Sequence, residues 1–218
     1  MWISKIVKKS DKFLLVILCI DILFILLSFI DRFTALNFSY FLVNRDNLFA
    51  ENFQYLKYIG ISMLSFLLAT KRKASQFFVF MIIPIYLYLD DQNRLHETFG
   101  NKIASLFTEG NPRDIFLISN VRFQDIGSVL YMSFVAFILL IIFLICFKLS
   151  KPSEKYFLKN ILNYFFIFGF FAVIVDLIER FFKGNIQILL GIFEDGGEMI
   201  AISFIAAHFF KYLKNRKI

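Results

Sequence analysis

Three segments of the chain place carboxylates at the ends of apolar runs that are long enough to cross a membrane. They read LDDQNRLHE over residues 89–97, DLIER over residues 176–180 and EDGGEM over residues 194–199. Carboxylates that lie close together, with or without an imidazole, can bind a metal ion, share protons or attract cations. The chemistry open to these segments therefore depends on whether the fold brings them together.

Helical spacing and depth both favour such a meeting. Asp90 and Glu198 each lie roughly 20 Å along a helix from the basic end of their apolar run, at 1.5 Å per residue. A carboxylate in lipid costs about 2.5–3.5 kcal/mol at a helix centre, so we expect these acids to face the interior of a bundle. The alternative is a set of helix caps and salt bridges in contact with water. The sequence predicts one polar site formed by Asp90, Asp91, His96, Glu97, Asp176, Glu179, Glu194, Asp195 and Glu198.

A divalent metal is one ligand that this site could take. Imidazole and carboxylate ligands are available from His96, Asp91, Glu97, Glu194 and Glu198. No HExxH motif or other specific metal spacing is present. The sequence therefore leaves three interpretations open, in which the carboxylates bind metal, bind protons or form only salt bridges.

Asp21 is a separate carboxylate near the middle of the first apolar run. A charged residue at that depth normally faces a cavity, a partner helix or another subunit. We predict that Asp21 lines a pore, and the alternative is a hydrogen bond to a neighbouring helix.

Six apolar stretches supply the elements that would position these residues. They cover approximately residues 13–30, 54–70, 76–95, 126–147, 160–178 and 194–212. Their lengths fit the roughly 20 residues that a helix needs to cross the hydrocarbon core, and no alternating strand pattern is present. With 59% hydrophobic residues, the chain is predicted to be all-α, a polytopic membrane helical bundle of about six transmembrane helices. We expect one domain over residues 1–218.

The distribution of charge sets the predicted orientation. Fifteen of the 24 lysines and arginines fall on one side of the six-span arrangement, and fourteen of the 17 acidic residues fall toward the other. The positive-inside rule places the basic side, with both termini, in the cytoplasm, which predicts a multi-pass protein of the bacterial inner membrane. Candidates for binding an anionic cytoplasmic ligand, such as a nucleotide or oligonucleotide, are Lys71, Arg72, Lys73, Lys151, Lys155, Lys159, Lys214, Arg216 and Lys217.

The acidic segments also carry a family resemblance. LDDQNRLHE, then Asp176, then EDGGEMIAISFIAAHFFKYL resemble a group of small bacterial polytopic membrane proteins, over about residues 34–212. That group has an LDE-like step followed by HE after its third span, and an EExxEM-like start to its last span. The resemblance implies the fold and the polar positions but assigns no activity. This chain has Asp91 and Asp195 where Glu is common in the group, which keeps the charge but shortens the reach.

Three functions fit this pattern. The first, which we favour, is a homo-oligomeric ion channel or membrane-disrupting effector. The high Phe, Ile and Lys content of the chain resembles that of membrane effectors in bacterial antiviral (anti-phage) defence. The second is an intramembrane, metal-assisted hydrolase that acts on lipid. The third is a cation-coupled transporter, for which the sequence shows no internal repeat. The favoured function makes the chain a non-enzyme, with the lipid bilayer and further copies of itself as partners.

Overall fold

The computed structural model describes residues 12–34, 38–44, 48–72, 74, 76–108, 111–112, 114–115 and 121–214. Within these ranges the chain forms helices and no β-strand. The long helices are α2 (Lys12–Phe33), α3 (Phe49–Arg72), α4 (Gln76–Asn93), α6 (Phe123–Leu149), α7 (Pro152–Gly169) and α9 (Asn185–Lys214). The shorter elements are η1 (Ser39–Phe41), α5 (Leu95–Ala104), the π-helical η2 (Phe170–Val175) and α8 (Asp176–Glu179). The all-α prediction is confirmed for the described residues.

Three helical segments are long and apolar enough to cross a membrane. They are Lys12–Phe33, Phe123–Leu149 and the continuous run Pro152–Glu179 through α7, η2 and α8. The chain therefore has the character of a membrane protein. The other long helices, α3, α4 and α9, match the remaining three apolar stretches but carry more polar side chains toward one end. Those polar side chains include Asp90, Asp91, Glu194, Asp195 and Glu198 of the predicted site.

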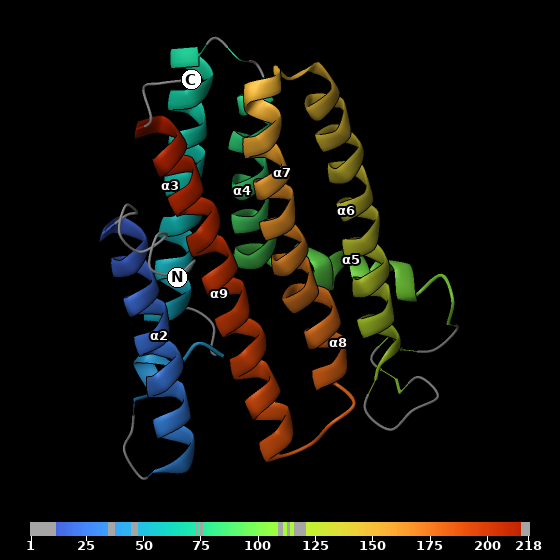
Figure 1. Cartoon of the computed structure of the whole chain (residues 1–218). Helices are drawn as coiled ribbons and strands as arrows, with labels where there is room; N and C mark the ends of the chain where they lie inside the picture. The colour runs from blue at the N-terminus through green and yellow to red at the C-terminus, as the bar shows by residue number, and fades with distance from the viewer. Residues whose placement is uncertain are drawn as a thin grey trace.

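The bundle is arranged around α9, which packs against α2, α3, α7, η2 and α8 (Figure 1). Aromatic side chains fill the centre. The Phe157 and Phe209 rings meet edge to face at 5.1 Å, and Phe80 lies 6.0 Å from Phe209. These three side chains are almost fully buried. Aromatic pairs in such geometries add to the packing energy, which gives the Phe-rich composition a structural role.

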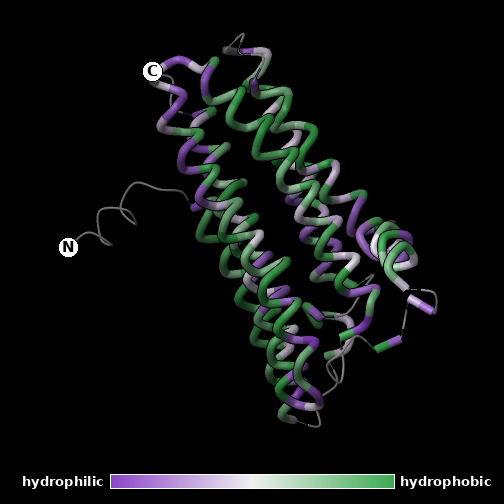
Figure 2. Tube along the Cα trace, turned by 90° about the vertical axis from the view of Figure 1, so that its right-hand side faces the viewer, coloured by the Kyte–Doolittle hydropathy of each residue, from purple (hydrophilic) through white to green (hydrophobic). Residues whose placement is uncertain are grey.

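The basic helix ends lie together at one end of the bundle, drawn at the top of Figure 1. The ends that meet there are the last turns of α3, α6 and α9 and the first turn of α7. Described basic residues of this end are Lys71, Lys148, Lys151, Lys155, Lys159, Lys211 and Lys214. The predicted ligand candidates Lys73, Arg216 and Lys217 lie outside the described residues, as does the Arg72 side chain. Figure 2 shows apolar residues along the middle of the helices and polar ones mainly toward their ends.

The third predicted span ends earlier than its apolar run suggested. Arg94 adopts a left-handed conformation with φ of 49°, which stops α4 and starts α5 in a new direction (Figure 1). A close helix crossing then holds α5 on α6. A Cβ on Gly127 would stand 2.1 Å from the Gly100 carbonyl oxygen, so this crossing requires glycine. The turn carries the backbone of α5 off the axis of α4, while His96 still contacts Asp90.

Candidate functional site

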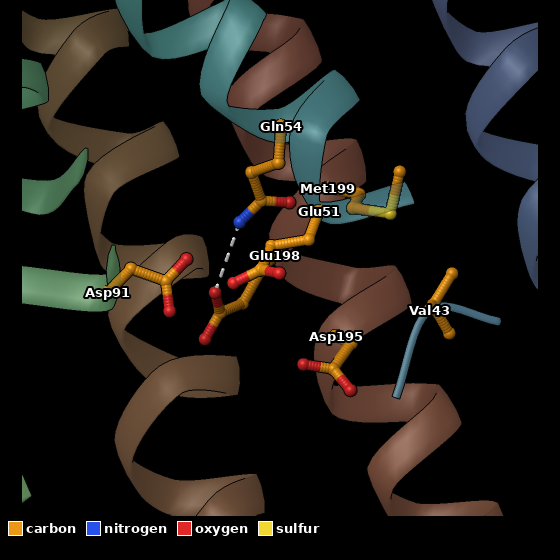
Figure 3. A pocket seen from close by; sticks show the side chains of 7 residues that line it. All are labelled: Val43, Glu51, Gln54, Asp91, Asp195, Glu198 and Met199. Atoms are coloured by element: carbon orange, nitrogen blue, oxygen red, sulfur yellow. Dashed lines mark hydrogen bonds between the residues drawn. The ribbon is translucent and has the colours of Figure 1, made fainter. Parts of the chain in front are cut away.

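Four carboxylates from three helices line one small cavity inside the bundle (Figure 3). Glu51 comes from α3, Asp91 from α4, and both Asp195 and Glu198 from α9. The remaining lining residues of this cavity, the carboxylate pocket, are Val43, Gln54 and Met199. Its volume of about 60 Å³ exceeds the about 10–15 Å³ that one water needs. The pocket therefore has room for a cation that keeps part of its hydration shell.

The carboxylate pocket concentrates negative charge. Gln54 Nε2 donates to Glu198 Oε2 at 3.4 Å and to Tyr58 Oη at 3.0 Å, which orients Glu198 into the cavity (Figure 3). Among the residues that the structure describes, no lysine, arginine or histidine forms an ion pair with Asp91, Asp195 or Glu198. Like charges in a poorly solvated site repel one another, so the carboxylates need a bound cation or protons.

A second acidic group joins α8 to the residue of α9 that directly precedes Asp195. Asp176 and Glu179 of α8 and Glu194 of α9 each offer an oxygen, and these oxygens lie within 4.8 Å of one another. The small Gly191 lets α8 approach α9, because a Cβ there would stand 3.3 Å from Glu179 Oε2. Arg180 pairs with Asp176 at 2.6 Å. This carboxylate triad is therefore partly neutralised from one side, unlike the carboxylate pocket.

Arg180 also ties the triad to α6. Its Nη1 lies 2.9 Å from Asp125 Oδ1, and Asp125 in turn accepts from Arg122 at the start of α6. Asp125 is buried. This chain of charges fixes the start of α6 relative to the end of α8.

The predicted site residues therefore form three groups. Asp91, Asp195 and Glu198 lie in the carboxylate pocket, and Asp176, Glu179 and Glu194 form the triad. Asp90 and His96 form a separate pair, with His96 Nδ1 at 3.1 Å from Asp90 Oδ2. The Glu97 side chain is 41% exposed and stands 4.0 Å from Arg94. The expected metal set is thus not brought together. Asp91 and Glu198 share the carboxylate pocket, whereas Glu194 belongs to the triad. His96 pairs with Asp90, and Glu97 lies outside all three groups.

The His96–Asp90 pair predicts a pH-dependent contribution to stability. Burial opposes the charge on the ring, but the hydrogen bond to Asp90 and the nearby carboxylates outweigh it, so the pKa of His96 is raised above 6.5. The stabilisation is then complete below the pKa of the unfolded chain and is lost as pH rises through the folded pKa. NMR titration of His96 should show this raised pKa, and Asp90→Asn should lower it. An unchanged His96 titration in that variant would contradict the assignment.

Asp21 lies inside the single chain and lines no open space there. Its side chain is fully buried, 2.8 Å from Lys57 Nζ and 2.5 Å from Ser203 Oγ. Lys57 also donates to the Met199 carbonyl oxygen at 2.9 Å. The alternative interpretation, a bond to a neighbouring helix, describes this geometry better than a pore-lining role. Lys57 joins α2, α3 and α9 directly behind the carboxylate pocket, since Met199 also lines that pocket.

Sequence reasoning did not identify Glu51, Gln54 and Lys57 as site residues. Lys57 lies within the second apolar run, where a lysine should seek a buried acid, so its pairing with Asp21 could have been inferred. Glu51 and Gln54 are three residues apart and share a face of α3. Glu51 was missed because α3 begins at Phe49, about one turn before the expected start of that span at residue 54. Gln54 is the first residue of the expected span and was missed because it carries no charge.

Comparison with known proteins identifies the family to which the chain belongs. No curated protein and no solved structure was found to be similar to the chain. A family described as a domain of unknown function, DUF8692, matches residues 50–212. The matched region holds all four pocket carboxylates, the triad and Lys57, and covers most of the chain. The chain therefore belongs to the DUF8692 family.

Proposed function

We propose that this protein is a six-span membrane protein that binds a divalent cation in the carboxylate pocket and uses it for metal-assisted hydrolysis at the membrane. The observation that carries the proposal is the convergence of Glu51, Asp91, Asp195 and Glu198 on one small cavity. Hard divalent cations such as Mg²⁺ and Ca²⁺ take oxygen ligands, and Mg²⁺ keeps several waters when few carboxylates bind it. A small cavity lined by carboxylates suits such an ion.

The roles of the residues follow from their positions. Asp91, Asp195 and Glu198 would hold the ion, and the Gln54 amide would orient Glu198. A bound divalent ion can polarise an oxygen of the substrate and lower the pKa of a bound water. The Lys57–Asp21 pair would fix α9 behind the pocket through the Met199 carbonyl, which keeps the two α9 carboxylates in place.

The proposed orientation has the basic end of the bundle in the cytoplasm and the carboxylate pocket toward the outer leaflet. Support comes from the gathering of the α3, α6, α7 and α9 ends at one end of the bundle (Figure 1), together with the positive-inside rule. An oligomeric channel or antiviral effector stays a prediction from the sequence. The complete burial of Asp21 in the single chain favours the alternative interpretation of that residue, a bond to a neighbouring helix, over a pore-lining role.

Metal analysis tests the proposal directly. Purified protein should hold close to one divalent ion per chain, by elemental analysis and by titration with Mg²⁺, Mn²⁺ and Ca²⁺. Asp195→Asn should weaken binding by more than the about 10–100-fold that loss of an outer partner costs, because it removes a proposed ligand. Glu97→Gln is the matched control, since Glu97 is exposed on α5, and it should bind as the parent does. Parent protein without stoichiometric metal, or Asp195→Asn with unchanged affinity, would refute a metal site.

A further inference from the structure

A larger cavity runs between α4, α6 and the α7–η2 segment, on another side of α4 from the carboxylate pocket. Its volume is about 640 Å³, within the about 300–1,000 Å³ typical of small-molecule sites. Its walls are almost wholly apolar. Representative lining residues of this apolar groove are Ile83, Leu87, Phe137, Leu140, Phe165 and Ile174.

The position of the apolar groove points to a lipid chain as its occupant. Two of its three walls, α6 and α7–η2, belong to segments that are able to cross a membrane. Along α7 and η2 the lining extends from Leu162 to Ile174, a distance of about 18 Å at 1.5 Å per residue. One leaflet contributes about half of a hydrocarbon core that is about 30 Å thick. The groove thus matches the length of one acyl chain and lies along segments that are able to cross a membrane.

The groove has one polar end, formed by Tyr86 and Asp90. Tyr86 Oη lies 3.1 Å from Tyr131 Oη and 3.4 Å from Asp90 Oδ1, and His96 contacts Asp90 from α5. The next residue, Asp91, lines the carboxylate pocket. A ligand with its chain in the groove would therefore place its polar group at the turn of α4 that carries Asp91 on its other side.

The π-helical segment η2 leaves open space in this wall. Gly169 lines the groove at the start of η2, and a Cβ built there would meet no atom within 4 Å. Single π turns inside α-helices occur frequently at functional sites. A side chain at Gly169 would therefore start in open space at the wall of the groove.

We infer that the apolar groove holds an acyl chain of a membrane phospholipid, whose phosphate lies at the Tyr86–Asp90 end beside the carboxylate pocket. A cation in that pocket supplies the charge complementarity for the phosphate, since Mg²⁺ sites commonly combine carboxylates with substrate phosphate. The assignment of phospholipid as the substrate class rests on the proposed function. The chain-binding groove is an independent feature of α4, α6 and α7.

Native mass spectrometry of the purified full chain with palmitoyl-oleoyl phosphatidylglycerol tests this inference. Gly169→Trp should weaken lipid retention at least about tenfold, because the indole displaces two or more methylenes. Gly60→Trp is the matched control: Gly60 is also a mid-helix glycine with no atom within 4 Å of a Cβ, but it lies on α3, away from the groove. It should retain the lipid. If Gly169→Trp fails to fold, Ala136→Trp on the α6 wall gives the same test.

The outcomes separate the two proposals. Equal lipid retention in the parent, Gly169→Trp and Ala136→Trp proteins would overturn the groove assignment. A parent protein that forms a dimer and no lipid adduct would also overturn it, if either tryptophan substitution abolishes that dimer. Oleic acid that competes as well as the phospholipid would overturn the role of the phosphate. Asp195→Asn should lose metal but keep the chain-bound lipid. A groove-dependent lipid adduct on protein that binds no metal would retain the inferred chain site and refute the proposed metal-assisted function.

Discussion

Replacing Lys57 with methionine is expected to destabilise the protein by about 3–5 kcal/mol, the cost of leaving a buried charge without its partner. Asp21 is fully buried, and its described polar contacts are Lys57 at 2.8 Å and Ser203 at 2.5 Å. Methionine keeps the length of the lysine stem but removes the ammonium group. The variant should also lose the hydrogen bond to the Met199 carbonyl oxygen and so loosen α9 behind the carboxylate pocket.

Thermal and denaturant unfolding in a mild detergent measures this effect. Lys71→Met is the control, because Lys71 lies on the same helix but is exposed, and it should change stability by less than about 0.5 kcal/mol. The double variant Asp21→Leu with Lys57→Met should recover most of the loss, since a buried ion pair is often replaced by apolar residues at little cost. A Lys57→Met protein as stable as the parent would show that the pair is not buried as described.

The helices of this protein are largely visible in its sequence. The six apolar runs correspond to six long helical segments among the described residues, because an apolar run of about 20 residues is typical of a long helix. The carboxylates at the ends of the third, fifth and sixth runs also come together through α4, α8 and α9. Their cost in lipid is a strong constraint, and burial against one another's helices is one of the few ways to meet it.

The sequence did not predict that those carboxylates would be divided into separate groups. Asp90 and Asp91 are neighbours in the chain, yet Asp90 faces the apolar groove and Asp91 the carboxylate pocket. Successive residues on a helix point about 100° apart, so the outcome depends on the rotation of α4, which is set by packing against α3 and α6. The left-handed backbone conformation of Arg94 then directs α5 so that His96 contacts Asp90. The spacing of apolar residues in the sequence predicts neither the rotation of α4 nor the turn at Arg94.

Gly127→Ala is expected to destabilise the protein by about 2 kcal/mol, although alanine is the better helix former by about 1 kcal/mol. The new methyl carbon would stand 2.1 Å from the Gly100 carbonyl oxygen and 2.8 Å from its carbon. These are backbone atoms, so α5 has to move as a unit, and overpacking of this kind costs about 1–3 kcal/mol or more. The movement should also break the bond from Ser128 Oγ to the His96 carbonyl oxygen, now 3.1 Å long. His96 would then lose its place beside Asp90.

Gly60→Ala separates this clash from the general effect of removing a glycine. A Cβ on Gly60 meets no atom within 4 Å, so alanine should stabilise α3 by about 0.5–1 kcal/mol. The two substitutions are chemically identical and both lie inside long helices, so opposite signs in detergent unfolding would isolate the α5–α6 contact as the cause. Stabilisation by Gly127→Ala would mean that α5 does not rest on α6 through these glycines. The polar end of the apolar groove would then lack the support that holds His96 next to it.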